Sequence, residues 1–367
     1  MTFHIDQKDG VQVGLGTQFI GRAESYKIQI GIQETKGIYW IPTQERNWNF
    51  GVFGESGSGK TQVIKNIVSQ LKAKQVSYIV LDSFGEYASK EAANQEFGQV
   101  VSLNEISVNP LEIANGKSLS EHVYSVVDTL NAIFNLNDIQ AHYLKDAIRR
   151  SYREKGIYED NPETWTRTPP IFLAVNKLLV EMEQQSKDVK DLLQKTGPSL
   201  NSPLFSRDKT MMPFERLVSG PVVLNLGALG TNEMKALASE FILAKIPRFV
   251  ENLSVAPQLF VVVDGAPNLF RMHSSSLQFL MEARRSGVGV IFPYRDPNNL
   301  PEIAFNSTAT IMTFRQSDTK VAKLTAERLN TAEQTLNKNL TDKFSAVVRF
   351  SSMTEAQRLS TLAYSKK

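Results

Sequence analysis

The fold of this protein is decided by the stretch Gly54-Glu55-Ser56-Gly57-Ser58-Gly59-Lys60-Thr61. It satisfies the pattern G-x-x-x-x-G-K-[ST], in which glycines let successive backbone N–H groups turn inward around phosphate oxygens. The apolar run 49–53 precedes it, and apolar side chains recur at helical spacing through residue 75. A strand, a glycine-rich turn and a helix in this order are the context that the motif needs. The sequence therefore predicts a phosphate-binding loop rather than a chance glycine-rich turn.

The residues of this loop have separate expected tasks. Lys60 is expected to reach the β- and γ-phosphates of ATP, and the hydroxyl of Thr61 is expected to ligate Mg²⁺. The helix that begins near Lys60 directs the positive end of its dipole at the same phosphates. The candidate ATP-binding residues are Gly54, Glu55, Ser56, Gly57, Ser58, Gly59, Lys60, Thr61 and Gln62.

Further apolar runs alternate with helical patterns along the chain. Runs typical of buried strands occupy residues 78–81, 221–226, 259–263, 289–292 and 310–314. Helical patterns at residues 232–250 and 274–285 separate three of these runs. Strands that alternate with helices form mostly parallel sheets covered by helices. The sequence predicts an α/β fold of the P-loop NTPase type, with a mostly parallel sheet flanked by helices.

A phosphate-binding loop also needs an acid on a neighbouring strand to hold Mg²⁺. Asp82 and Asp264 both follow apolar strands. The run 259–263 is the stronger buried strand, so Asp264 is the candidate metal ligand together with Thr61. The alternative is an aspartate that only caps a turn.

The composition restricts the classes of site and of partner. The 367 residues include no cysteine, which excludes disulfides, thiolate metal sites and cysteine nucleophiles. The longest apolar runs are far shorter than the roughly 20 residues that span a bilayer, and no secretory signal opens the chain. We expect a soluble, cytoplasmic protein without a membrane segment of its own. The formal net charge of +3 is weak evidence for a nucleic-acid partner. The four histidines are far apart, without ligand spacing: His4, His122, His142 and His273.

Changes in pattern divide the chain into segments. Residues 1–45 are expected to form a short N-terminal β region, and residues 46–116 and 205–350 the ATPase core. The mostly helical stretch 117–204 is expected to interrupt this core as an insertion. Residues 351–367 are expected to form a C-terminal tail.

Several segments outside the loop resemble one group of P-loop proteins. They are Tyr78-Ile79-Val80-Leu81-Asp82-Ser83-Phe84-Gly85-Glu86-Tyr87, Val108-Asn109-Pro110-Leu111, Glu282-Ala283-Arg284-Arg285-Ser286-Gly287-Val288-Gly289-Val290-Ile291, Asn299-Leu300-Pro301-Glu302 and Thr313-Phe314-Arg315. Over roughly residues 40–350 they look like the HerA/FtsK group of DNA-pumping ATPases, and like its HerA branch in particular. Within this group the chain most resembles the C-terminal ATPase modules of bacterial DNA-defence systems, such as the DptH ATPases of phosphorothioation-dependent restriction.

The resemblance implies a RecA/FtsK-like core that forms hexameric rings, with ATP at each subunit interface and double-stranded DNA in the central channel. It also implies a partner nuclease or other complex subunits, and a role in antiviral defence. Arg284 is implied as an arginine finger for the neighbouring subunit's γ-phosphate, because guanidinium pairs bidentately with phosphate oxygens. The alternative for Arg284 is a solvated helix end. Two further catalytic candidates are Arg315, in the matching segment Thr313-Phe314-Arg315, and Arg295, at a position where the chain departs from the group.

The chain departs from this group at two places. Gly265 follows Asp264, where the group has a glutamate that polarises the attacking water, and Tyr294-Arg295 replaces its Thr-Gln pair. Losing a positioned base typically costs about 10²–10⁴-fold in rate, so slow hydrolysis is expected, and Gly265→Glu is expected to accelerate it. Glu86 is a candidate substitute base, expected at the end of a strand that adjoins the strand before the loop. The alternative for Glu86 is an acid that holds a turn.

A DNA channel should present basic side chains that bind phosphates without reading bases. For each candidate the alternative is a solvated face. The candidates are Arg149, Arg150, Arg153, Lys155, Lys338 and Lys343. The first functional hypothesis is an ATP-dependent translocase or helicase-type motor subunit for double-stranded DNA, acting in a ring. The second is an ATP-binding assembly module that hydrolyses poorly because of Gly265, and the third is a secretion or conjugation ATPase.

Overall fold

The computed structural model describes most of the chain. The described residues are 27–88, 96–103, 105–113, 118–206, 212, 214–250, 257–265, 269–337, 340, 344–362 and 364. Two further backbone segments form the antiparallel pair β1 (Val11–Val13) and β2 (Gln18–Ile20). Lys338 and Lys343, two of the candidates for DNA contact, lie outside the described residues.

An eleven-stranded sheet forms the centre of the protein, in the order β4-β3-β13-β12-β11-β5-β10-β9-β6-β8-β7. The strands from β11 to β7 are parallel, and β12, β13, β3 and β4 continue the sheet with antiparallel pairing. This confirms the predicted α/β fold with a mostly parallel sheet. The strands are β3 (Ile28–Gln33), β4 (Lys36–Trp40), β5 (Phe50–Phe53), β6 (Tyr78–Asp82), β7 (Gln99–Val101), β8 (Pro221–Asn225), β9 (Leu259–Asp264), β10 (Val288–Tyr294), β11 (Thr310–Phe314), β12 (Ser345–Arg349) and β13 (Gln357–Thr361).

Helices cover both faces of the parallel part of the sheet, which explains why its strands are nearly continuous apolar runs. Strands β5, β6, β9 and β11 are buried along their whole length. Successive residues of β6 serve opposite cores, since Ile79 belongs to one buried cluster and Val80 to the other. Helix α1 (Lys60–Ala73) packs into the cluster of Val80. Helices α8 (Asn232–Lys245) and α9 (Ser275–Glu282) pack into the cluster of Ile79.

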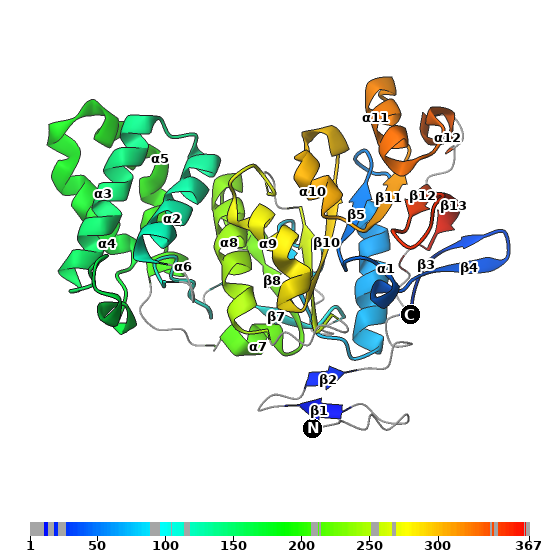
Figure 1. Cartoon of the computed structure of the whole chain (residues 1–367), viewed down its shortest axis with the longest axis horizontal. Coiled ribbons are helices and arrows are strands. Elements are labelled where there is room, and N and C mark those ends of the chain that lie inside the picture. The colour runs from blue at the N-terminus through cyan, green and yellow to red at the C-terminus, as the bar shows by residue number, and fades with distance from the viewer. Residues whose placement is uncertain are drawn as a thin grey trace.

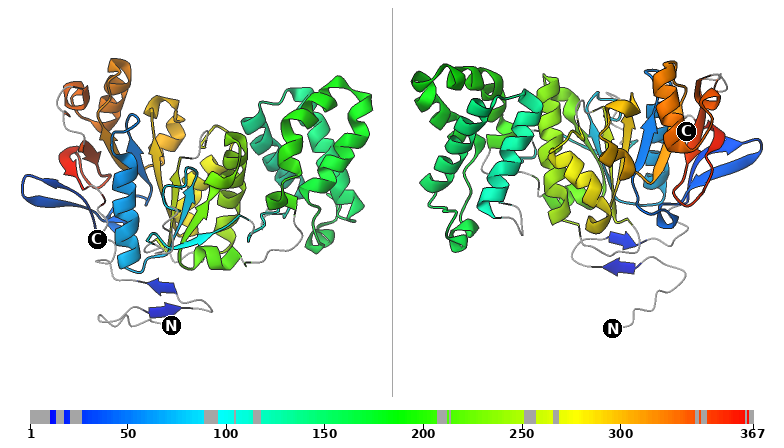
Figure 2. Two further views of the ribbon diagram at one scale, coloured as in Figure 1. Left: turned by 180° about the vertical axis from the view of Figure 1, so that it is seen from behind. Right: turned by 45° about the horizontal axis from the view of Figure 1, so that its top comes forward.

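The helices between β7 and β8 form a lobe at one end of the molecule. Figures 1 and 2 show this lobe beyond α8, at the end opposite the β3–β4 hairpin. Helices α2 and α3 begin with reciprocal capping boxes, Ser118 with Glu121 and Asn137 with Gln140, which satisfy their first N–H groups. The lobe contains α2 (Leu119–Phe134), α3 (Asp138–Glu154), α4 (Phe172–Met182), α5 (Lys187–Leu200) and α6 (Pro203–Ser206).

Shorter helices complete the core. They are α7 (Phe214–Val218), α10 (Glu302–Asn306), α11 (Thr319–Leu329) and α12 (Glu333–Asn337). Across the described ranges, every helix is too short or too polar to traverse a lipid bilayer.

Both ends of the chain contribute strands to the same sheet, which corrects two of the predicted boundaries. Strand β13 lies between β12 and β3, so residues 357–361 of the expected tail belong to the core sheet. Its residues alternate between exposed and buried, because one face covers the core and the other faces solvent. Strand β3 pairs with β13 and β4 pairs with β3, so residues 28–40 of the expected N-terminal β region belong to the core sheet.

Candidate nucleotide-binding site

The candidate residues gather where five neighbouring parallel strands end. In sheet order, Arg315 follows β11, the loop 54–59 follows β5, Arg295 follows β10, and Asp264 and Asp82 end β9 and β6. Carboxyl ends of parallel strands form one edge of a sheet, where ligands of open α/β sheets bind. Strand β10 lies between the strand of the loop and the strand of Asp264.

The glycine-rich loop has backbone conformations that are unfavourable for residues with a side chain. Gly54, Gly57 and Gly59 all have positive φ, at 152°, 77° and 112°. A Cβ on Gly54 would lie 2.8 Å from the hydroxyl of Ser58 and 2.9 Å from Phe314. Gly59 precedes α1 without a side-chain cap, so the first N–H groups of the helix are not satisfied by a capping side chain.

Two polar groups inside the loop suit a phosphate. The Nζ of Lys60 donates to the carbonyl oxygens of Gly54 at 2.7 Å and of Glu55 at 2.8 Å, so the ammonium lies within the turn. The hydroxyl of Ser58 is buried and has no hydrogen-bond partner among the described residues. Burial lowers the pKa of Lys60, and Arg295 lowers it further, while the carboxylates of Asp264 and Glu55 raise it.

Glu55 ties the loop to the segment after β11. Its two carboxylate oxygens accept hydrogen bonds from the N–H of Ser317 at 2.7 Å and from the hydroxyl of Ser317 at 3.0 Å. Gly54 donates its N–H to the carbonyl oxygen of Tyr294 at the end of β10, at 3.2 Å. The loop is therefore held from both neighbouring strands, and Ser56 and Gly57 form its exposed tip.

Asp264 is the buried acid whose charge acts on Lys60, and β10 lies between the two strands that carry them. Its side chain is 7% exposed, and its Oδ2 accepts a hydrogen bond from the hydroxyl of Tyr87 at 2.7 Å. Burial raises the pKa of Asp264 to about 6; Glu86 and Asp82 also raise it, whereas the Tyr87 hydrogen bond and Lys65 lower it. A bound cation beside this carboxyl would favour its charged form.

Asp82, the other strand-end acid, holds a turn. Its Oδ1 accepts from the N–H of Glu86 at 3.0 Å, and its Oδ2 accepts from the N–H groups of Tyr87 at 2.8 Å and Ala88 at 3.0 Å. Both oxygens are thus used within the turn 82–88. This leaves Asp264 as the acid that is presented to the loop.

Glu86 does not lie beside the strand that carries the loop, which corrects the expectation for its position. Strands β10 and β9 lie between β5 and β6. The Oε2 of Glu86 pairs with Nζ of Lys65 on α1 at 3.2 Å. A carboxylate that is held in this ion pair is less available as a base for water at the phosphates.

Gly265 has a conformation that explains why glycine suits this position. Its φ is +78°, and a Cβ would lie 2.2 Å from the ring of Phe84, which is 66% exposed. A glutamate here would adopt a left-handed backbone at a cost of about 1–2 kcal/mol and would have to displace the ring. Gly265→Glu would therefore introduce backbone strain and a steric clash together with the missing carboxylate, and the faster hydrolysis expected of it stays a prediction.

The three candidate arginines lie at different places. Arg295 and Arg315 are exposed beside the loop. Arg284 lies in the turn Ala283–Ser286, just before β10 starts, and therefore at the opposite edge of the sheet from the loop. It donates to the carbonyl oxygen of Arg46, and its guanidinium lies 5.7 Å from the ring centre of Trp48. Arg284 thus cannot act on the loop of its own chain, and its role for a neighbour stays a prediction.

The basic residues of the lobe are partly neutralised. Arg149 pairs with Glu159 at 2.7 Å, and Arg150 lies 3.9 Å from Glu181. Arg153 and Lys155 are exposed at the end of α3. These contacts weaken the prediction of DNA contact for Arg149 and Arg150.

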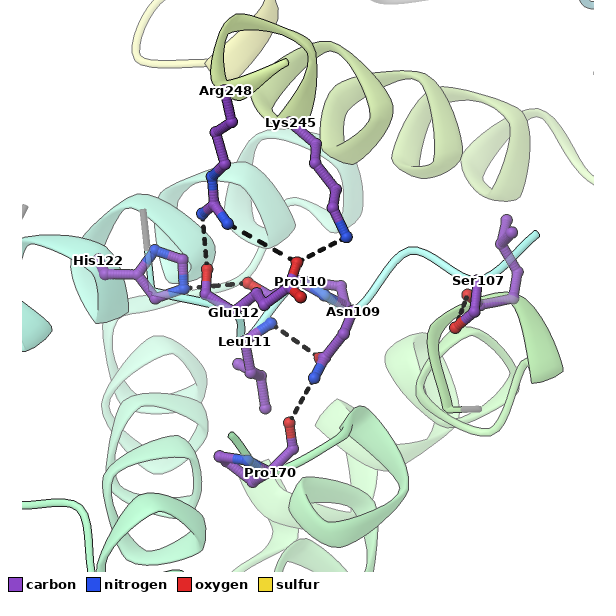
Figure 3. Close-up of polar contacts among 10 residues, drawn as sticks. Ser107, Asn109, Pro110, Leu111, Glu112, His122, Pro170, Lys245 and Arg248 are labelled. Atoms are coloured by element: carbon purple, nitrogen blue, oxygen red, sulfur yellow. Dashed lines mark hydrogen bonds and ion pairs between the residues drawn. The ribbon is translucent and has the colours of Figure 1, made fainter. Parts of the chain in front are cut away.

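The turn that contains Asn109 and Pro110 joins the lobe to the core (Figure 3). The amide of Asn109 donates to the carbonyl oxygen of Pro170 at 2.9 Å, and Glu112 pairs with Lys245 of α8 at 2.6 Å. A cavity of about 370 Å³ beside this turn is lined by both lobe and core residues, including His122 and Glu282. None of the phosphate-loop residues lines it.

The comparison of sequences decides the family. The pattern of a family described as the central domain of the HerA helicase matches residues 47–246, more than half of the chain. The chain belongs to the HerA central-domain family. The match spans the loop, β6, the helical lobe and α8, and the predicted resemblance to the HerA/FtsK group is thereby confirmed.

Several solved structures have a fold similar to that of this chain. VirB4 of Thermoanaerobacter pseudethanolicus has 16% sequence identity and a TM-score of 0.72, over 92% of this chain and 96% of that chain. The plasmid coupling protein TrwB in complex with the non-hydrolysable ATP analogue ADPNP has 12% identity and a TM-score of 0.62, over 93% of this chain and 90% of that chain. TrwB in complex with ADP and Mg²⁺ has 12% identity and a TM-score of 0.63, over 93% and 89%. At these identities the likeness shows the P-loop fold. No curated protein matches the chain.

Two contacts at the site of this HerA-like chain are not predicted by its sequence. The hydroxyl of Tyr87 binds Asp264, 177 residues along the chain, and the ring of Phe84 covers Gly265. Both residues lie in the turn after β6, in a segment that resembles the family but whose sequence predicts no role for either side chain. No local pattern in the sequence of this turn indicates either contact.

Proposed function

We propose that this chain is an ATP-hydrolysing motor subunit that works in a ring with other copies and moves double-stranded DNA. The observation that carries the proposal is the phosphate loop with Lys60 inside it and the buried Asp264 whose charge acts on Lys60. Membership of the HerA central-domain family supports a motor function. The likeness to the conjugation protein TrwB, whose structures hold ADPNP or ADP with Mg²⁺, supports the same cofactors here.

The residues at the site fit ATP and Mg²⁺. The N–H groups of the loop, the N-terminus of α1 and the ammonium of Lys60 would bind the phosphates. Thr61 and Asp264 would hold the metal ion, whose charge would neutralise the phosphate oxygens. Lys60 now donates to two carbonyl oxygens of the loop, so it must exchange these bonds for phosphate oxygens when the nucleotide binds.

A ring would bring an arginine of one copy to the phosphate loop of its neighbour. Arg284 lies at the sheet edge opposite its own loop, so it can act on a phosphate only if another copy brings its loop there. Arg295 and Arg315 are exposed beside the loop, where the interface with a neighbour would cover them. The basic end of α3, with Arg153 and Lys155, remains available for the DNA backbone in such a ring. A nuclease partner and a role in antiviral defence belong to the same proposal.

A second candidate function is an ATP-binding assembly module that hydrolyses poorly. The observation that favours it is Gly265, with its positive φ and with the ring of Phe84 over it, in place of a carboxylate. Glu86, the candidate substitute, is paired with Lys65. A third candidate, a conjugation or secretion ATPase, rests on likeness in fold to VirB4 and TrwB.

One set of measurements separates these candidates. A fluorescent ATP analogue is titrated into the wild type, Lys60→Ala and Lys72→Ala, and phosphate release is followed with and without duplex DNA. Lys72 is a matched control because it lies in the last turn of α1 and donates to the carbonyl oxygen of Glu96. A motor gives nucleotide binding that only Lys60→Ala abolishes, and phosphate release that duplex DNA increases. Binding without DNA-stimulated release favours the assembly module, and equal binding by Lys60→Ala refutes the phosphate site.

A further inference from the structure

The contact between Tyr87 and Asp264 is placed by a rigid frame. Asp82 and Asp264 are register partners on adjacent strands, so the turn after β6 lies directly beside the end of β9. Within that turn, Asp82 accepts the N–H of Tyr87 at 2.8 Å. The Tyr87 ring packs edge-to-face on Phe97, with ring centres 5.3 Å apart. The hydroxyl of Tyr87 is therefore held in place from its backbone and from its ring.

The hydroxyl fixes one of the two oxygens of Asp264. Tyr87 donates to Oδ2 at 2.7 Å, a short bond to an acceptor that is buried. No other described side chain or N–H donates to this carboxyl. An aspartate whose two oxygens are equivalent can turn about its last bond, whereas one that is bonded through Oδ2 presents Oδ1 in a fixed direction.

We propose that Tyr87 is a positioning residue for the metal: its hydroxyl holds Asp264 so that the other carboxylate oxygen is directed at Mg²⁺ bound with the nucleotide. The inference rests on the proposed function, since it assumes that Asp264 serves the metal. Groups that orient a metal ligand through a hydrogen bond typically change metal affinity by about 10–100-fold when they are removed. The same contact also explains why the turn after β6 is tied so closely to β9.

Tyr87→Phe tests the inference because it removes one oxygen atom and keeps the ring against Phe97. Tyr78→Phe is a matched control: the Tyr78 hydroxyl is also buried, and it donates to the carbonyl oxygen of Phe97 at 2.9 Å without touching Asp264. A fluorescent ATP analogue is titrated into each protein in EDTA, and its binding is then measured against increasing Mg²⁺. We expect all three proteins to bind alike in EDTA. Tyr87→Phe should need at least about tenfold more Mg²⁺ for half of the gain in affinity, and Tyr78→Phe should behave as the wild type.

A double-mutant cycle guards against a merely structural effect. If Tyr87 acts through Asp264, then Tyr87→Phe adds no further shift in the Mg²⁺ requirement to Asp264→Asn. Additive shifts overturn the inference, as does an unchanged Mg²⁺ requirement in Tyr87→Phe or an equal shift in Tyr78→Phe. A wild type that binds no nucleotide overturns the proposed function and this inference with it. A wild type that binds nucleotide while Tyr87→Phe responds normally to Mg²⁺ overturns the inference alone.

Discussion

Glu240 provides a quantitative test of the packing between α8 and α9. Its side chain is 2% exposed, and its two oxygens accept hydrogen bonds from the N–H and the hydroxyl of Ser276, both at 2.6 Å. Burial raises the pKa of Glu240 from 4.5 to about 7, although the bonds from Ser276 and the charge of Arg271 lower it. The folded protein therefore keeps a proton that the unfolded chain releases as the pH rises above 4.5.

This difference makes stability depend on pH with a defined sign. Between the two pKa values the folded state binds more protons than the unfolded state, so the free energy of unfolding falls as the pH rises. Above the pKa that Glu240 has in the folded protein, this loss of stability is complete. Below the pKa that it has in the unfolded chain, the loss is absent. At about 1.4 kcal/mol per pKa unit, the change between about pH 5 and about pH 8 is on the order of 2–3 kcal/mol.

Glu240→Gln removes the titration and keeps the shape. The amide oxygen can accept the N–H of Ser276, and the amide NH₂ can donate to its hydroxyl, as a protonated Glu240 does. We expect the variant to be close to the wild type near pH 5 and more stable by about 2–3 kcal/mol near pH 8. Urea unfolding followed by circular dichroism measures this. Glu233→Gln, at an exposed position in the first turn of α8, is the control and should show no such trend. A stability difference for Glu240→Gln that stays constant across this range refutes the reasoning.

Three further predictions concern residues at the two ends of the parallel strands. Gly265→Ala should lower the free energy of unfolding by about 1–2 kcal/mol because Gly265 has a positive φ. In thermal unfolding, adding Phe84→Ala should recover only the part of this loss that comes from the clash with the Phe84 ring. A Gly265→Ala variant as stable as the wild type would contradict the positive φ at this position. Arg284→Ala should reduce hydrolysis by assembled protein about 10³-fold or more while leaving nucleotide binding intact; an equal loss in Arg285→Ala, the neighbouring exposed arginine, argues against a finger. Asp82→Asn should lose an acceptor for the turn N–H groups and cost about 1–3 kcal/mol, with faster amide exchange confined at first to residues 86–88; unchanged exchange contradicts the turn.

The sequence contained enough to predict the loop, the parallel sheet and the family, because these depend on local patterns. The motif at 54–61 needs only adjacent residues, and apolar runs such as 259–263 mark strands that are buried on both faces. The order of the strands is set by packing between distant segments. Glu86 was consequently expected beside the loop strand, whereas two strands separate β6 from β5.

The parts of the site that could not be predicted are contacts between distant residues and backbone angles. Nothing local indicates that the Tyr87 hydroxyl reaches Asp264 or that Gly265 has φ of +78°. The candidate roles of Lys60 and Asp264 stay predictions until nucleotide binding is measured. Strand β13 was missed because its residues, Gln357 to Thr361, are mostly polar and alternate in burial.

The position of β13 in the sheet sets the order in which its neighbouring strands can pair during folding. Strand β3 pairs with β13, as Ile32 with Ser360, so the first hairpin joins the sheet through residues made more than three hundred positions later. During synthesis the β3–β4 hairpin and the free edge of β12 stay unpaired until residues 357–361 leave the ribosome. Unpaired strand edges of this kind attract other chains, and pairing over long sequence separations is slow. Strand β13 therefore joins the two parts of the sheet, and a variant without it would expose the edges of β12 and β3 to aggregation.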